Sequence, residues 1–189
     1  MQTYTRVEYK LSKNKLVQKI KEGAIFIYPT DTIYGIGCDA TNEKAVAKIR
    51  EIKGNFKRPF SVIVPDKEWI YENCDVASRE EEWLKKIPGA FTLILNLRNM
   101  ECVSANAHGG DTLGIRIPDH WCTEIAELSG LPIITTSANL SGGMFMTSLD
   151  TLHDNIKKHV DFMIDIGEVK GRPSMIINLA GEDEQVIER

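Results

Sequence analysis

Apolar residues recur along the chain in short continuous runs, most of which end at proline, glycine or a polar residue. Runs of this kind are typical of strands that are buried on both faces of a sheet. The pattern predicts strands at residues 24–28, 60–64, 91–97, 113–117, 132–136, 162–166 and 175–179, with residues 185–188 as a further candidate. Pro29 and Pro118 directly follow two of these runs and mark their ends.

Between these runs, apolar residues return every three or four positions, which is the period of a helix with one buried face. This spacing predicts helices at residues 12–22, 42–52 and 120–129, each followed by a glycine. The Ser-Arg-Glu-Glu sequence at 78–81 indicates a capping box that opens a short helix, with Ser78 as its N-cap. Leu149, Leu152 and Ile156 also lie at helical spacing.

Predicted strands and helices alternate over the whole chain, which favours an α/β fold with a mixed sheet and flanking helices. The length of 189 residues suits a single domain over residues 1–189. No stretch approaches the roughly 18 consecutive apolar residues of a membrane span, and residues 1–15 lack the apolar run of a signal peptide. We therefore expect a cytoplasmic protein with no membrane partner.

Composition changes this picture only by exclusion. The chain has 23 basic and 27 acidic side chains, a net charge of −4, which argues against coating nucleic acid by bulk charge. The four cysteines form no Cys-x-x-Cys pair, so neither zinc nor a disulfide framework is indicated, and we expect no protein-ligated metal. The chain also lacks a P-loop, a dinucleotide fingerprint and a nucleophile elbow.

Two polar stretches follow predicted strand or helix ends, where α/β proteins bind ligands. Thr30, Asp31 and Thr32 come directly after the first strand, and they fit either a binding loop or a capped turn. Lys53, Lys57 and Arg58 lie within six residues of one another. Three cations in one loop suit a polyphosphate, although a solvated basic turn explains them equally well.

Arg116 interrupts an otherwise apolar strand, where a charge is costly unless it is paired. Its partner is either a substrate carboxylate or one of the residues Asp31, Asp111 and Asp119. Residues 135–143 add hydroxyls, an amide and two glycines at another strand end, which is a composition that cradles phosphates. The long loop 99–112, which carries His108, is a candidate lid or binding loop. Residue chemistry alone thus predicts an α/β protein that binds an anionic ligand.

The same stretches, in order, resemble the YrdC family. They are residues 28–35, 53–59, 113–118 and 135–143, joined by Pro88-Gly89-x-x-Thr92 and Gly171-Arg172-Pro173-Ser174. The resemblance runs from about residue 14 to 177. It implies a twisted sheet with an open concave cavity, as in YrdC and RibB. It also implies a nucleotidyltransferase that makes threonylcarbamoyl-AMP from L-threonine, bicarbonate (or CO2) and ATP with Mg²⁺, for tRNA modification.

The resemblance assigns roles residue by residue. L-threonine would be bound by Thr32, Ile63, Arg116, Ser137 and Ser174. ATP would be bound by Lys53, Asn55, Lys57, Arg58, Thr112, Asn139, Thr147 and Arg189. Catalysis would rest on Lys53, Arg58, Ser137 and Asn139.

This chain departs from the family at three positions. Asn55 replaces an arginine, so Arg58 or Lys57 is expected to supply the missing cation. Ile63 stands near the position where many members carry histidine, and Met175 replaces a threonine.

The resemblance also implies partners: a downstream threonylcarbamoyl-transferase complex, and a contact with tRNA or double-stranded RNA. Two alternatives remain open. One is a YrdC-like paralogue that binds RNA without this synthesis. The other is a carbamoyl-transfer module of the hydrogenase-maturation type, whose acylphosphatase and zinc-finger modules this sequence lacks.

Overall fold

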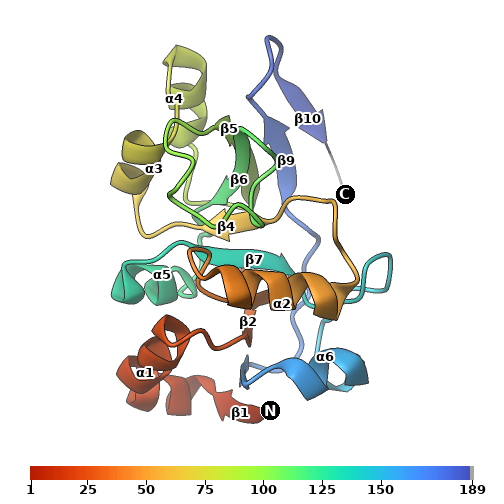
Figure 1. Cartoon of the computed structure of the whole chain (residues 1–189). Coiled ribbons are helices and arrows are strands. Elements are labelled where there is room, and N and C mark those ends of the chain that lie inside the picture. The colour runs from red at the N-terminus through yellow and green to blue at the C-terminus, as the bar shows by residue number, and fades with distance from the viewer. Residues whose placement is uncertain (188–189) are drawn as a thin grey trace.

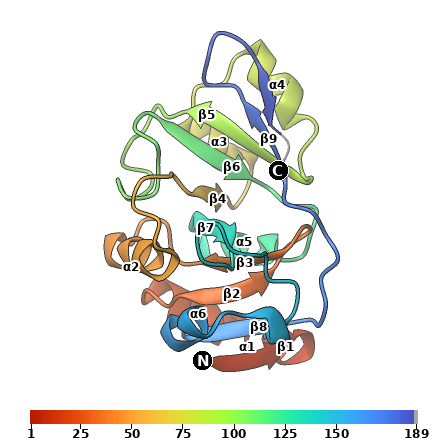
Figure 2. The same cartoon turned by 90° about the vertical axis from the view of Figure 1, so that its right-hand side faces the viewer.

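A computed structural model describes residues 1–187, in which ten strands form one mixed sheet of order β1-β8-β2-β3-β7-β4-β6-β5-β9-β10 (Figures 1 and 2). The strands are β1 (Gln2–Thr5), β2 (Phe26–Pro29), β3 (Tyr34–Gly37), β4 (Ser61–Ile63), β5 (Phe91–Asn96), β6 (Thr112–Arg116), β7 (Ile133–Ser137), β8 (Phe162–Asp165), β9 (Met175–Asn178) and β10 (Gln185–Ile187). The predicted α/β fold with a twisted mixed sheet is confirmed.

Six α-helices and one 3₁₀ turn flank the sheet within this range. They are α1 (Arg6–Lys21), α2 (Glu43–Lys53), α3 (Lys67–Asn73), α4 (Ser78–Leu84), α5 (Thr123–Ser129), η1 (Leu149–Thr151) and α6 (Asp154–His159). None of the helices in the described residues is both long enough and apolar enough to span a bilayer.

The two faces of the sheet are covered differently. Helices α2, α3, α4 and α6 bury Ile49, Ile70, Leu84 and Ile156 in one large cluster on the first face. On the second face, α1 and α5 pack over β1, β8, β2, β7 and the end of β4, and their cluster takes no described residue from β5, β6 or β9. That half of the second face, which we call the open face, is where the cavity described below lies.

Chain segments far apart in sequence meet at one edge of the sheet. Strand β1 pairs in parallel with β8, with Gln2 beside Phe162 and Thr5 beside Asp165. After β8 the chain crosses the molecule through residues 166–174, which we call the strap, and enters β9 in the other half of the sheet (Figure 2). Both halves of the sheet are therefore completed only by the last third of the chain.

Two predictions about elements are wrong, each for a local reason. Helix α1 starts six residues before the predicted position, because Thr5 and Glu8 form a capping box. The sequence pattern did not indicate this start, because the apolar residues Val7 and Leu11 of the first turns are exposed and not on the buried face. Helix α4 is present, but Ser78 is its first residue and not its cap. The Glu80 carboxylate accepts a hydrogen bond from the Ala77 N–H at 3.0 Å instead.

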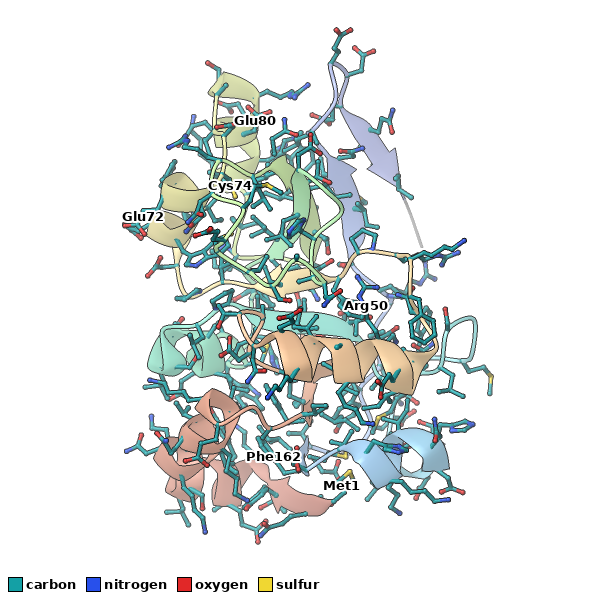
Figure 3. All side chains as sticks on the ribbon, viewed as in Figure 1. Met1, Arg50, Glu72, Cys74, Glu80 and Phe162 are labelled. Carbon is teal, nitrogen blue, oxygen red and sulfur yellow. The ribbon has the colours of Figure 1, made fainter. Side chains whose placement is uncertain are left out.

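The loop 99–112 is held against the body of the protein along its length. Its backbone pairs with Ala40 through Ser104 and with Phe60 through Ala107. Arg50, labelled in Figure 3, donates through Nε to the Asn106 carbonyl at 2.7 Å. These contacts argue against a lid. The alternative of a binding loop remains, since Thr112 at the end of the loop lines one of the cavities described below, whereas His108 lines neither.

Candidate functional site

Strand register gathers small and polar residues at one place on the open face. Gly35 pairs with Ser137, while Ser61 pairs with both Thr135 and Gly114. Residues paired across strands point to the same face of a sheet. These five residues, drawn from four strands, form what we call the floor, and Thr92 and Arg116 border it on β5 and β6. No bulky apolar side chain fills this part of the face, so it can be hollow.

Two connected cavities lie over the floor. The inner cavity, of about 40 Å³, is lined by Thr30, Thr32, Ile33, Tyr34, Gly35, Ser61, Thr92, Arg116, Thr135, Thr136, Ser137, Phe145, Pro173 and Ser174. The outer cavity, of about 630 Å³, adds Lys53, Asn55, Arg58, Pro59, Phe60, Ile94, Thr112, Gly114, Asn139, Ser141, Gly142, Gly143 and Ile176. Both share Ser61, Thr92, Thr136, Ser137 and Phe145. The volumes suit a small polar ligand inside and a nucleotide-sized one outside.

The loop between β2 and β3 forms one wall of the inner cavity. The Thr30 hydroxyl donates to the Ile33 carbonyl at 2.7 Å and accepts from the Thr32 and Ile33 N–H groups. It also lies 2.9 Å from the Thr32 hydroxyl. The loop is therefore both a capped turn and part of a cavity, so the two sequence interpretations hold together.

Arg116 is paired with Asp31, one of the partners that the sequence left open. Its Nη2 lies 2.7 Å from Asp31 Oδ1, and its Nε donates to the Phe91 carbonyl at 3.2 Å. Arg116 as a whole is 5% exposed, and it still lines the inner cavity. Because Asp31 cancels its charge, the cavity presents a fixed, directional donor without a large net charge. Asp31 Oδ2 is buried with no hydrogen-bond partner in the structure, which leaves the carboxylate only this one strong contact.

The strap supplies the opposite wall. The Ser174 and Thr92 hydroxyls lie 2.7 Å apart, which fixes the end of the strap on β5. The Tyr34 hydroxyl holds its start, since it accepts from the Ile166 N–H at 3.0 Å and donates to the Gly167 carbonyl at 2.8 Å. At Gly171 the strap runs so close to the Thr32 carbonyl that a Cβ would stand 1.7 Å from its oxygen. The strap is thus held in place against the inner cavity.

Lys53, at the end of α2, holds the wall between the two cavities. Its ammonium donates to the carbonyls of Ser137 and Asn139, the latter at 2.8 Å, and to Asn139 Oδ1 at 3.3 Å. Burial lowers the pKa of Lys53 to about 8, so it still carries its charge at neutral pH. Lys53 thereby fixes the Ser137–Asn139 turn and brings one positive charge to the outer cavity.

The following turn is held by its own side chains. Asn139 accepts a short hydrogen bond from the Ser137 hydroxyl, and its Nδ2 donates to the Gly143 carbonyl at 2.6 Å. The Gly143 N–H in turn bonds to the Leu140 carbonyl. This leaves a compact glycine-rich loop on the outer cavity with Ser137 at its inner end.

The basic loop 54–59 holds both candidate cations, Arg58 and Lys57, but in different surroundings. Arg58 lines the outer cavity, whereas Lys57 is exposed and does not line it. Asn55 shapes the loop, because its Oδ1 accepts from the Arg58 N–H at 3.0 Å. Arg50 supports the loop from below with a hydrogen bond to the Arg58 carbonyl at 3.1 Å.

Two of the expected site residues, Ile63 and Thr147, are not brought into this site. Ile63 is fully buried in the cluster under α1 and α5, because this end of β4 lies beneath the two helices and not on the open face. Thr147 lines neither cavity, and its backbone instead bonds to Thr151 Oγ1 and Val169. Arg189 lies outside the described residues. The remaining assigned residues, apart from Lys57, line one or both cavities.

Several lining residues were not predicted from the sequence as site residues. Ser61, Thr92 and Gly114 lie inside strands that the sequence predicts only as apolar runs. A signal was present, since each of them interrupts an otherwise apolar stretch with a small or polar residue. Phe145 carries no such signal, because its role depends on where the loop after β7 folds.

Comparisons with known proteins show which sequences and structures this chain resembles. The model of the Sua5/YciO/YrdC family, described as telomere recombination, matches residues 18–189. A protein of Methanocaldococcus jannaschii, provisionally named a threonylcarbamoyl-AMP synthase, is 40% identical over 176 residues, or 91% of this chain and 81% of that protein. The threonylcarbamoyl-AMP synthase of Pyrococcus abyssi is 34% identical over 166 residues, which are 85% of this chain. The chain spans about half the length of that relative, 48%.

Among solved structures, P. abyssi Sua5 complexed with L-threonine superposes with a TM-score of 0.86 at 29% identity, over 98% of this chain and 56% of that one. E. coli YciO superposes with a TM-score of 0.87 at 23% identity, over 100% of this chain and 95% of that one. The second likeness concerns the fold alone.

Replacing Asp31 with asparagine should lower the free energy of unfolding by about 3 kcal/mol, because Arg116 would remain buried without a counter-charge. A double-mutant cycle with Arg116→Gln can be measured by urea unfolding. The double mutant should lose less stability than the sum of the two single losses, by at least about 1 kcal/mol. The exposed Asp111 provides a control, since Asp111→Asn should change stability by less than about 0.5 kcal/mol. Additive losses at Asp31 and Arg116 would contradict the pairing.

The stability of the wild type relative to Lys53→Met should rise between pH 8 and 10.5. In that range the native protein has released the Lys53 proton, while the unfolded chain still binds it up to the ordinary pKa of 10.5. The slope should reach at most about 1.4 kcal/mol per pH unit. Urea unfolding of both proteins at several pH values measures it, with the exposed Lys57→Met as the matched control for removal of one charge. A flat difference would mean that native Lys53 keeps its proton throughout.

Proposed function

The chain belongs to the Sua5/YciO/YrdC family, and from this premise we propose that it is a threonylcarbamoyl-AMP synthase. The proposed reaction joins L-threonine, CO2 (from bicarbonate) and ATP, and it releases pyrophosphate. The observation that carries the proposal is the pair of cavities that meet at Ser137, one small with a paired arginine and one large with cations.

The inner cavity is the proposed L-threonine site. Arg116 offers its remaining N–H groups to the carboxylate, in a direction fixed by Asp31 and Phe91. Thr32 and Ser174 offer hydroxyls on opposite walls for the amine and hydroxyl of the ligand. The charges of Arg116 and Asp31 cancel, which suits a zwitterionic ligand that carries one charge of each sign.

The outer cavity is the proposed ATP site. Arg58 and Lys53 supply positive charge for the phosphates, and the loop 139–143 supplies backbone at the same wall. Thr112 lies on the far side, while Pro59, Phe60, Ile94, Phe145 and Ile176 provide apolar surface for a base. No carboxylate occurs among the lining residues in the described range, so Mg²⁺ would arrive bound to the triphosphate.

The proposed chemistry makes two bonds. The threonine amine attacks CO2 and loses a proton, which gives a carbamate. A carbamate oxygen then attacks the α-phosphorus of ATP, and the bond from this phosphorus to the bridging oxygen of pyrophosphate breaks. Neither step needs a covalent protein intermediate, so the contribution of the chain is to orient the reactants and neutralise charge. Ser137 lines both cavities, which supports its assignment to the point where the carbamate and the α-phosphate meet.

A reactive adenylate needs an acceptor, so we further propose that the product passes to a threonylcarbamoyl-transferase complex that modifies tRNA. Direct contact of this chain with tRNA or double-stranded RNA belongs to the same proposal and rests on the family resemblance alone.

Purified protein should release pyrophosphate from Mg-ATP only when L-threonine and bicarbonate are both present. Arg116→Lys serves as a control, because it keeps the charge but loses the planar guanidinium, and it should raise the KM for threonine more than that for ATP. Release that ignores threonine, or none at all together with tight binding of double-stranded RNA, would reject the synthase.

Arg58→Ala should raise the KM for ATP about tenfold, since a charge-assisted hydrogen bond to phosphate contributes about 1.5–3 kcal/mol. Lys57→Ala should leave it nearly unchanged, because Lys57 does not line the cavity. Steady-state pyrophosphate release measures both variants at saturating threonine. Equal effects at the two positions would mean that Arg58 is not the phosphate-binding cation.

A further inference from the structure

Neither the backbone conformation at Gly35 nor the packing around it requires glycine. It lies inside β3, and its φ angle is not among the positive values found at six other glycines. A Cβ added there would have its closest neighbours at 3.5 Å, the Thr136 carbonyl and the Tyr28 ring, which are ordinary contacts. Because glycine weakens a strand interior, its presence here calls for another reason.

Other glycines on the same face show what a packing reason looks like. A Cβ on Gly37, two residues further along β3, would stand 2.4 Å from the Ile134 carbonyl oxygen and 2.9 Å from the Tyr28 ring. A Cβ on Gly114 would stand 2.7 Å from the Ser61 hydroxyl. Both positions are closed to a side chain by their neighbours, whereas Gly35 is open.

The space that is open at Gly35 is the inner cavity. Gly35 lines this cavity, and its register partners Tyr28 and Ser137 place its missing side chain on the open face between an aromatic ring and a hydroxyl. The cavity measures about 40 Å³. A methyl group added at Gly35 would project into this small cavity and reduce the room left there for a ligand.

We infer that Gly35 is the residue that sets the size of the amino-acid side chain admitted to the inner cavity. The inference rests on the proposed function and deepens it: the absence of a Cβ makes the room for the β-substituents of threonine. Arg116, Thr32 and Ser174 recognise polar groups, but they do not separate threonine from the smaller serine, which carries the same groups without the methyl. The floor beneath the ligand distinguishes the two amino acids, because the space left at Gly35 accommodates the additional methyl group of threonine.

The test is Gly35→Ala with threonine and serine as competing substrates. The ratio of kcat/KM for threonine over serine should fall about tenfold or more, the effect expected for one methyl group in a tight pocket. The KM for ATP should stay within about twofold, because Gly35 does not line the outer cavity. The melting temperature should stay near that of the wild type, since the new Cβ makes ordinary contacts.

Gly37→Ala is the matched control on the same strand and face. It should lower the melting temperature, and at a temperature where it is folded it should keep the wild-type preference for threonine over serine. An unchanged ratio in Gly35→Ala would overturn the inference. Loss of folding in Gly35→Ala would overturn it as well, because glycine would then be required by packing.

Calorimetry with L-threonine and L-serine in the absence of ATP separates this inference from the proposed function. If the wild type binds threonine but releases no pyrophosphate, the synthase proposal fails, while a reduced threonine preference in Gly35→Ala still supports the role of Gly35. If the wild type binds neither amino acid, the inference fails too.

Discussion

A buried arginine and its carboxylate partner determine where the rest of the site can lie. Arg116 interrupts the apolar strand β6, and the cost of burying its charge requires a counter-charge within hydrogen-bonding distance. Asp31 meets that requirement from the loop between β2 and β3, which belongs to the other half of the sheet. Because Thr30 and Thr32 flank Asp31, the same ion pair brings their hydroxyls to the cavity. One electrostatic requirement thus positions two walls.

The floor shows how part of a sheet can be left uncovered by helices. On the covered half of its second face, the sheet presents Phe26, Tyr28 and Phe162 to α1 and α5. On the open half, the residues of the floor are glycine, serine and threonine, and Ile94 and Ile176 lie beside them. Small hydroxyl side chains can hydrogen-bond to water or to a ligand, whereas large apolar ones would need a helix to cover them. The residues that favour binding are therefore also those that leave the face uncovered.

The sequence predicted most of the sheet and the contents of the site, but not the contacts among its residues. Apolar runs located the buried strands because burial on both faces demands such runs. They missed β1 and β3, which are short and polar or glycine-containing. The family resemblance named Lys53 and Ser137, yet the contact of the Lys53 ammonium with the Ser137 carbonyl depends on how α2 meets β7. Ile63 was misplaced because sequence position alone does not tell where an open face ends.

The pairing of β1 with β8 also sets a condition on when this protein can become functional. Residues 2–5 find their strand partner only after residues 162–165 have been synthesised, and the strap that carries Ser174 follows later still. Contacts between such distant parts of a chain slow folding and leave sheet edges unpaired in the meantime. The floor can assemble from residues 35–137, but its last wall comes from the strap. A nascent chain would hold the arginine and the floor well before it had a closed pocket, so ligand binding would report that synthesis has passed the strap.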